Sequence, residues 1–281
     1  MIMQAIRRCF SSSTIARMKV VPVPVRSDNY AYLIIEEASN KATAVDPWDV
    51  SAVSAAAKKH VAATRLVLCD IHHDAITLLI GGFAQEFAST YPDAAIYGGS
   101  NQSPALTKIV TDKEEFTLGD NIAVKCLATP CHTQDSICYH VTDKTKQNDA
   151  GGVFTGDTLF IGGCGRFFEG TAEEMDAALT YLGTLPDKTV VYNGHEYTKG
   201  NVAFAKSVES DNKAIAKLEN LAKTNEITTG LTTIGEEKEW NVFMRLEDSA
   251  VRKGAGVAVD APKNKVMDAL REAKNNFRGN L

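Results

Sequence analysis

Histidines and one aspartate stand where apolar segments end. Four of the six histidines follow segments typical of short strands: His72 and His73 follow RLVLCD, His132 follows LATPC and His195 follows VVYNG. Asp157 follows another such segment, in FTGDTLF. Neutral imidazole and carboxylate are ligands of zinc-like ions, which generate hydroxide near neutral pH. One histidine alone would more simply be a satisfied or exposed side chain, but five such positions together favour a metal-dependent hydrolase.

The elements that must position these residues mix strands and helices, which indicates an α/β fold. Apolar segments bounded by turn residues predict strands at 19–25, 30–35, 42–47, 65–70, 95–99, 122–130, 136–143, 151–157 and 189–197. Helices are expected between them at 51–61, 81–91 and 175–185, the last preceded by a capping box of Thr171 and Glu174. After His195 the periodicity becomes helical, over 201–226 and 263–277. These helices predict an appendage packed on the first domain.

Composition and charge exclude several classes of protein. The 281 residues are 44% hydrophobic and 23% charged, with a net charge of −5. No stretch approaches eighteen consecutive apolar residues, so the sequence contains no typical membrane-spanning helix. There is no basic stripe, which disfavours nucleic acid as a partner. The six cysteines form no CxxC pair and indicate a reducing compartment.

The first 17 residues differ in composition from the rest. They contain Arg7, Arg8 and Arg17, several serines and no acidic residue. This composition, loosely amphipathic and without a long apolar run, is typical of a mitochondrial transit segment. We therefore expect a mitochondrial matrix protein. The alternatives are a disordered cationic tail and a cytoplasmic form translated from Met18.

Several segments together resemble one family. SDNYAYLI, AVDP, VKCLATPCHT, FTGDTLFIGGCGRFFEGTAEEM, YNGHEYT and FMR occur in this order, and they are similar to segments of glyoxalase II, the hydroxyacylglutathione hydrolases of the metallo-β-lactamase superfamily. The resemblance covers about residues 18–277. It implies an αββα sandwich over 18–195 followed by a helical, glutathione-binding domain over 196–281. It also implies hydrolysis of S-D-lactoylglutathione and related thioesters at a centre of two zinc or other divalent ions.

The resemblance assigns metal ligands and catalytic residues to matching positions. His132 in PCHT corresponds to a ligand of the first metal, and His195 in GHEY to a ligand of the second. Asp157 in TGD corresponds to the aspartate that bridges the two metals, and is expected with Asp74 to carry catalysis.

Substrate contacts are carried over in the same way. Tyr197 and Arg166 match a tyrosine and a basic residue that contact glutathione, whereas Phe168 stands where the family has a tyrosine hydroxyl. Arg271 and Lys274 match the basic pair that holds the glycine carboxylate of glutathione. Three residues apart, they share one helix face, which suits an anion. Without the resemblance, that pair would simply indicate a solvated face.

The main departure is in the metal-binding signature T-H-x-H-x-D-H. This chain has CDIHHDA at 69–75, so Asp70 and Ala75 replace two histidines, while His72 and Asp74 are retained. An insertion, AITLLIGG, follows. A register shifted by one residue would leave only His73 in a ligand position.

The sequence also differs just after His132, where it reads QDS and brings Asp135 and Ser136 near the expected site.

These changes predict a weakened two-metal centre. The first metal would retain His72, His132 and Asp157, with Asp70 as a doubtful fourth ligand. The second would retain Asp74, Asp157 and His195. Carboxylate in place of imidazole favours oxygen-preferring ions over zinc, and one or both sites could be empty.

Three functions follow from this sequence. The first is a mitochondrial pseudoenzyme with a binding or structural role. The second is an active metal-dependent thioesterase with a modified or single-metal site, acting on a glutathione thioester or a related thiol. The third is a scaffold subunit with protein partners in a large mitochondrial assembly.

Overall fold

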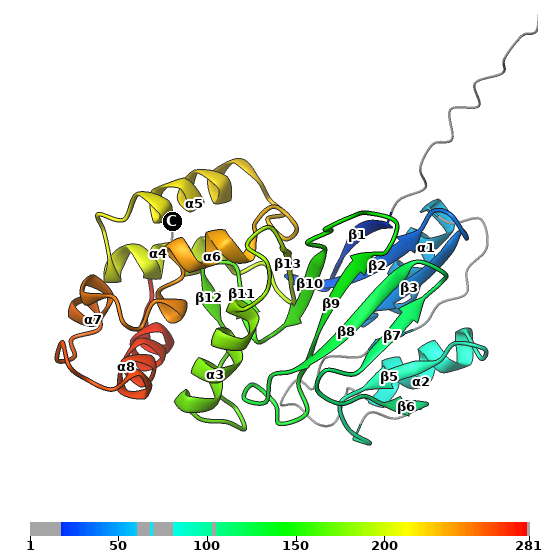
Figure 1. The fold of residues 1–281 in the computed structure, drawn as a ribbon, viewed down its shortest axis with the longest axis horizontal. Coiled ribbons are helices and arrows are strands. Elements are labelled where there is room, and N and C mark those ends of the chain that lie inside the picture. Colours follow the sequence, from blue (N-terminus) through cyan, green and yellow to red (C-terminus); the bar gives the residue numbers. More distant parts are fainter. Residues whose placement is uncertain (1–17, 61–67, 70–80, 103–104, 280–281) are drawn as a thin grey trace, which may run out of the picture.

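The fold is arranged in layers, two sheets packed face to face with helices outside them (Figure 1). The computed structural model describes residues 18–60, 68–69, 81–102 and 105–279. A cluster of helices, coloured from yellow to red in Figure 1, adjoins one end of the layers. The expected α/β sandwich with a helical C-terminal region is therefore confirmed.

The first sheet contains six strands in sequence order. They are β1 (Met18–Val25), β2 (Asn29–Glu36), β3 (Lys41–Val45), β4 (Leu68–Cys69), β5 (Ile96–Gly98) and β6 (Lys108–Ile109). The β1–β2 and β2–β3 pairs are antiparallel, and the later pairs are parallel. The crossover connections contain α1 (Val50–His60) and α2 (Gly81–Thr90).

The second sheet has the order β13-β10-β9-β8-β7. Its strands are β7 (Glu115–Leu118), β8 (Ile122–Ala128), β9 (Ile137–Asp143), β10 (Gly152–Gly156) and β13 (Val190–Asn193). β13 is parallel to β10, and the other pairs are antiparallel. Consequently β8, β10 and β13 run in the same direction and end at the same edge of the sheet.

Strand β2 explains the layering, because it is buried on both faces. Ala31, Leu33 and Ile35 pack in the cluster that includes α1, whereas Tyr30, Tyr32 and Ile34 pack between the two sheets. Successive side chains of a strand point to opposite faces, so a strand covered on both sides has a continuous apolar run.

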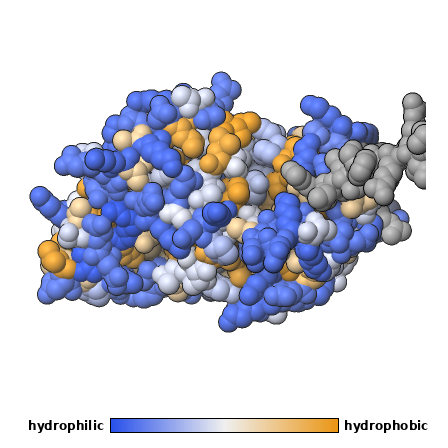
Figure 2. All heavy atoms as spheres, turned by 45° about the horizontal axis from the view of Figure 1, so that its top comes forward, coloured by the Kyte–Doolittle hydropathy of each residue, from blue (hydrophilic) through white to orange (hydrophobic). Residues whose placement is uncertain are grey.

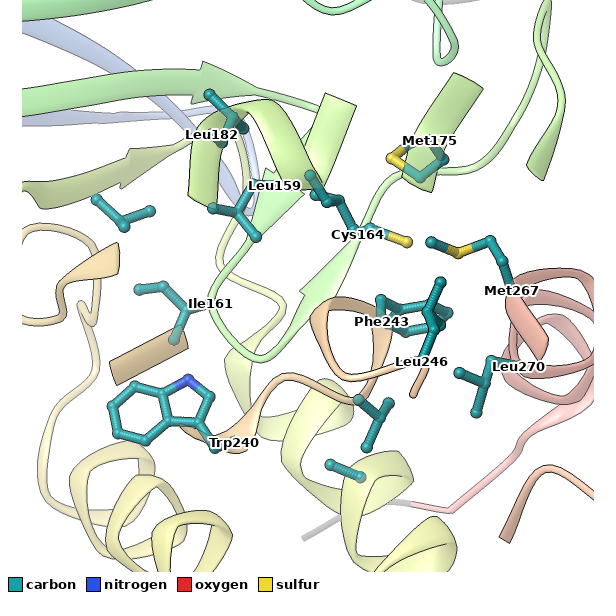
Figure 3. Packing of buried hydrophobic residues seen from close by; sticks show 14 of the residues in the cluster. Leu159, Ile161, Cys164, Met175, Leu182, Trp240, Phe243, Leu246, Met267 and Leu270 are labelled. Carbon is teal, nitrogen blue, oxygen red and sulfur yellow. The ribbon is translucent and has the colours of Figure 1, made fainter. Parts of the chain in front are cut away.

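The helices of the second half share a core with the outer side of the second sheet. They are α3 (Ala172–Gly183), α4 (Thr198–Val208), α5 (Lys213–Thr224), α6 (Ile234–Trp240), the 3₁₀ helix η1 (Val242–Met244), α7 (Ser249–Gly254) and α8 (Lys263–Asn276). A short hairpin, β11 (Leu159–Phe160) and β12 (Gly163–Cys164), enters this core. Figure 3 shows Leu159, Ile161 and Cys164 of the hairpin among side chains of these helices, such as Trp240 and Met267.

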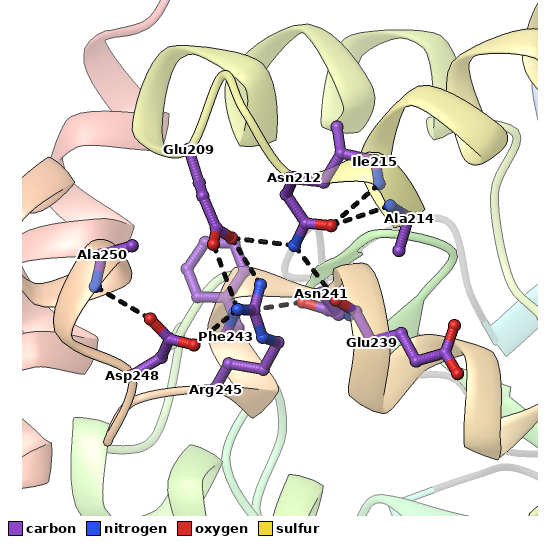
Figure 4. A network of polar contacts seen from close by, with 10 residues as sticks. All are labelled: Glu209, Asn212, Ala214, Ile215, Glu239, Asn241, Phe243, Arg245, Asp248 and Ala250. Atoms are coloured by element: carbon purple, nitrogen blue, oxygen red, sulfur yellow. Dashed lines mark hydrogen bonds and ion pairs between the residues drawn. The ribbon is translucent and has the colours of Figure 1, made fainter.

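The helical expectations were partly wrong. The single helix expected over 201–226 is two helices, because Asn212 accepts the backbone N–H groups of Ala214 and Ile215 and so begins α5. Glu209, just before this break, pairs with Arg245, which also pairs with Asp248 (Figure 4).

The capping box of Thr171 and Glu174 is present at the start of α3. The terminal helix expected at 263–277 is α8.

The surface is mostly hydrophilic on the face in Figure 2, with separate hydrophobic patches. Exposed large hydrophobic side chains include Phe168 and Tyr197, whose rings lie against His132 and His195. Among the described residues, no helix combines the length and the hydrophobicity needed to span a membrane.

Candidate active site

Three of the predicted metal ligands come together in the structure: His132, Asp157 and His195. Nε2 of His132 and Nε2 of His195 each lie 3.4 Å from Oδ2 of Asp157. All three side chains are buried, with 5%, 7% and 7% of their surfaces exposed. Two imidazoles therefore share one carboxylate oxygen in a nearly closed site.

The second sheet explains why these side chains meet. His132 follows β8, Asp157 follows β10 directly, and His195 lies two residues after β13. Because these three strands run in the same direction, their carboxyl ends meet at one edge. Residues distant in sequence are thus gathered where α/β folds commonly have their sites.

Two glycines let the backbone pass close to Asp157, one beside its carboxylate and one beside its backbone carbonyl. A Cβ atom at Gly194 would lie 2.5 Å from Oδ1 of Asp157. A Cβ atom at Gly165 would lie 1.8 Å from the carbonyl oxygen of Asp157 and 3.2 Å from Nδ1 of His132. Any larger residue at either position would displace Asp157 or His132.

Each imidazole is oriented by an oxygen acceptor at Nδ1. Nδ1 of His132 donates to the carbonyl oxygen of Arg166 at 2.9 Å, and Nδ1 of His195 donates to Oδ1 of Asp28 at 3.0 Å. A neutral ring held in this way directs its Nε2 lone pair away from that partner. Such outer contacts are typical of histidines that bind metals.

Asp28 and Asn29 belong to a part of the site that sequence reasoning missed. The backbone N–H of Tyr30 donates to Gly194, and that of Glu196 donates to Asp28, so the β1–β2 turn is attached to the loop carrying His195. Nδ2 of Asn29 lies 3.2 Å from Nε2 of His195. The only signal in the sequence was the position of both residues within SDNYAYLI.

The chemistry of this donor set suits a divalent cation. An imidazole lone pair and a carboxylate oxygen repel each other unless a proton or a cation lies between them. Two ligands at about 2.0–2.2 Å from a tetrahedral ion are separated by roughly 3.4 Å, which matches both distances to Asp157.

Further ligands are needed for a complete set. Within 18–60, 68–69, 81–102 and 105–279, no three His, Cys, Asp or Glu side chains are arranged to hold an ion by themselves. The additional predicted ligands Asp70, His72 and Asp74, with His73 and Ala75, lie outside the described residues.

The predicted substrate residues on α8 form a cationic cluster. Arg271 is 8% exposed, and its guanidinium donates to the carbonyl oxygens of Cys164 and Gly165. Lys274 is half-buried and donates to the carbonyl oxygen of Gly200 at 2.7 Å. Among the described residues no carboxylate pairs with either cation.

This cluster carries unfavourable positive charge. Burial, with a contribution from Arg271, lowers the pKa of Lys274 to about 8. Burial also lowers the pKa of Arg271, and the charge of Arg166 contributes to that shift. The positive charges of Arg271, Lys274 and Arg166 destabilise one another, which favours an anion as their partner.

Two exposed aromatic rings flank the imidazoles. Tyr197 stacks on His195 with ring centroids 4.7 Å apart, and Phe168 lies 5.0 Å from the His132 ring. Phe160 of the hairpin meets both Tyr197 and His195 edge-on. The site is thus bordered by rings that can cover a ligand.

Asp135 and Ser136 take structural roles. Oδ2 of Asp135 accepts from Ser100, and Oγ of Ser136 contacts Thr133. Neither has a hydrogen bond with the three converging side chains among the contacts of the described residues.

Comparisons with known proteins find relatives that match nearly the whole chain. The family model described as "Hydroxyacylglutathione hydrolase C-terminus" matches residues 196–277. The chain is 40% identical to the cytoplasmic hydroxyacylglutathione hydrolase of Arabidopsis thaliana, over 92% of this chain and 97% of that protein. It is 39% identical to the mitochondrial hydroxyacylglutathione hydrolase of Saccharomyces cerevisiae, over 95% of this chain and 99% of that protein.

A solved structure agrees at the level of the fold. A metallo-β-lactamase from Staphylococcus aureus is 23% identical and superposes with a TM-score of 0.62, covering 92% of this chain and 72% of that chain. The chain therefore has the metallo-β-lactamase fold and belongs to the hydroxyacylglutathione hydrolase (glyoxalase II) family.

Proposed function

We propose that this protein binds glutathione thioesters and that its hydrolytic centre is impaired, so that binding is retained while turnover is low. The observation that carries the binding half is the cluster of Arg271 and Lys274, whose charges have no carboxylate partner among the described residues. A glycine carboxylate of glutathione would supply that partner. The exposed rings of Tyr197 and Phe168 would border the thioester end of the ligand.

The second half of the proposal depends on the metal centre. His132, Asp157 and His195 would hold part of a divalent ion site, with His72, Asp74 and Asp70 as the remaining candidates. When bound, such an ion supplies Lewis-acid activation of water for hydrolysis. The chain's own contribution is to orient both imidazoles through Arg166 and Asp28 and to exclude bulk water by burial.

The motif CDIHHDA is the reason for expecting low turnover. With Asp70 and Ala75 in place of two histidines, the centre would lose two neutral nitrogen ligands. The specific alternative is an active thioesterase with a modified or single-metal site, favoured by the convergence of His132, Asp157 and His195.

One experiment separates these functions. The purified full chain is assayed for zinc stoichiometry, for binding of S-hexylglutathione and for hydrolysis of S-D-lactoylglutathione, with Asp157→Ala as control. We expect micromolar-class binding, on the order of −8 kcal/mol, with hydrolysis near that of the control. Rapid hydrolysis that disappears in Asp157→Ala would replace this proposal with the thioesterase. Absence of binding would leave the scaffold role.

The location in the cell is part of the proposal. The relatives include a mitochondrial and a cytoplasmic form. The cationic residues 1–17 favour the mitochondrial matrix, and fluorescence microscopy of a C-terminally tagged chain tests this against the cytoplasmic distribution expected for translation from Met18.

A further inference from the structure

A buried carboxylate on α6 supports the segment that joins the two halves of the site. The Glu237 side chain is fully buried, and its Oε2 accepts the backbone N–H of Gly162 at 2.9 Å. The same oxygen accepts Nδ2 of Asn241 at 3.0 Å. Buried carboxylates are costly unless they make such bonds, so this one is not explained by packing alone.

The contacts of Glu237 and Asn241 fix the hairpin formed by β11 and β12. Gly162 lies at its two-residue turn with a positive φ of 68°. Nδ2 of Asn241 also donates to the carbonyl oxygen of Gly163 at 3.0 Å. The N–H of Gly162 and the carbonyl oxygen of Gly163 are therefore both held by side chains of the helical region.

The three residues after Gly163 contact both parts of the proposed site. The carbonyl oxygen of Cys164 accepts from Arg271 at 2.9 Å, within the cationic cluster. The carbonyl oxygen of Arg166 accepts from Nδ1 of His132 at 2.9 Å, next to Asp157. A shift of the hairpin would move both acceptors at once.

We propose that Glu237 is a positioning residue: by holding the β11–β12 hairpin, it sets the orientation of His132 and Arg271 relative to each other. This inference rests on the proposed glutathione-thioester site for its effect on binding. Its effect on His132 follows from the contacts alone. Glu237 touches neither the ligand site nor Asp157, and acts through Gly162 and the Cys164–Arg166 segment.

Two substitutions of Glu237 distinguish the position of its oxygen acceptor from its negative charge as the property that matters. Glu237→Gln keeps the length of the side chain and one oxygen acceptor, while Glu237→Asp keeps the charge and withdraws the acceptor by one methylene. A positioning role predicts that Gln preserves the site and Asp disturbs it. A role based on negative charge predicts the reverse order. Burial raises the pKa of Glu237 to about 7, with Glu236 contributing, so a neutral side chain is compatible with the fold.

Glu236→Ala is the matched control for helix stability. It removes the capping box at Thr233 and the ion pair with Lys217, so it weakens α6 without touching Gly162.

The experiment has one readout that requires a ligand and one that does not. Calorimetry with S-hexylglutathione is expected to show about ten-fold weaker binding for Glu237→Asp and less than about two-fold change for Glu237→Gln and Glu236→Ala. Long-range ¹H–¹⁵N NMR of the histidine rings is expected to show a shifted His132 Nδ1–H signal only in Glu237→Asp.

The outcomes separate the two proposals. If the wild-type chain binds no S-hexylglutathione, the proposed function fails, and the NMR signal still decides the role of Glu237. An unchanged His132 signal in Glu237→Asp, or equal shifts in Glu237→Gln and Glu236→Ala, would overturn the positioning role.

Discussion

The two parts of the site require partners of opposite charge. At the edge of the second sheet, two carboxylates, Asp157 and Asp28, lie against the imidazoles of His132 and His195. On α8, Arg271 and Lys274 are surrounded by backbone carbonyls and require a negative partner. One part thus suits a cation and the other an anion. A divalent ion at the first part and the carboxylate of a ligand at the second would satisfy both, and the following substitutions test each part separately.

The largest expected effect is on the cation side. Asp157→Asn removes the charge that both imidazoles share, so we expect zinc affinity to fall by more than the ~10–100-fold typical of an outer-shell partner. Zinc competition with a chromophoric chelator measures this. Asp120→Asn, an exposed surface change, is the control. Unaltered affinity in Asp157→Asn would place any bound ion elsewhere.

On the anion side, Arg271→Met removes charge-assisted hydrogen bonds to the ligand. Binding of S-hexylglutathione should weaken roughly 10–100-fold, the equivalent of about 1.5–3 kcal/mol. Calorimetry provides the measurement, and Lys265→Met changes an exposed lysine on the same helix as control. Zinc affinity should be the same in both variants, since α8 contributes no proposed ligand. Equal binding by Arg271→Met and wild type would show that Arg271 does not bind the ligand carboxylate.

Asp28→Asn tests the contact behind His195. The amide oxygen can still accept from Nδ1, but the negative charge that favours a proton on that nitrogen is lost. A decrease in zinc affinity of about ten-fold is expected, with ligand binding at α8 unaffected. A change in S-hexylglutathione binding without a change in zinc affinity would contradict the separation of the two parts.

The smallest effect is the pH dependence of ligand binding. With a folded pKa of about 8, Lys274 loses its charge as the pH rises through 8, so anion affinity should decrease above that pH by at most about ten-fold per unit. Lys274→Arg retains its charge and should bind with a flatter profile between pH 7 and 9.5. The ligand titrates identically in both measurements, so parallel profiles would exclude Lys274 from the site.

Local patterns predicted individual elements of the fold, whereas the layered αββα arrangement was predicted only through the family resemblance. The continuous apolar run of β2 reports burial on both faces, and the capping box at Thr171 marks the start of α3. The convergence of His132, Asp157 and His195 followed from strand ends alone. Sequence failed where a distant contact decides the local structure. The break between α4 and α5 was missed for a different reason: Asn212 is a local cap that accepts the N–H groups of Ala214 and Ile215 at the start of α5.

The contacts that orient the site residues could not be predicted from the sequence either. Asp28 meets His195 across 167 residues, and Glu237 meets Gly162 across 75. Nothing in the residue types near either position indicates its partner. Periodicity identifies which face of a helix is buried, but not which backbone group a buried carboxylate accepts.

Restoration of the signature motif tests most directly the claim that the two replaced histidines limit turnover. Asp70→His combined with Ala75→His returns two imidazoles to the sequence positions where the family has them. At equal protein and zinc, we expect S-D-lactoylglutathione hydrolysis to rise at least about 100-fold over wild type, or some 2.7 kcal/mol of transition-state stabilisation, with S-hexylglutathione binding unchanged. Equal turnover by wild type and the double variant would contradict the account.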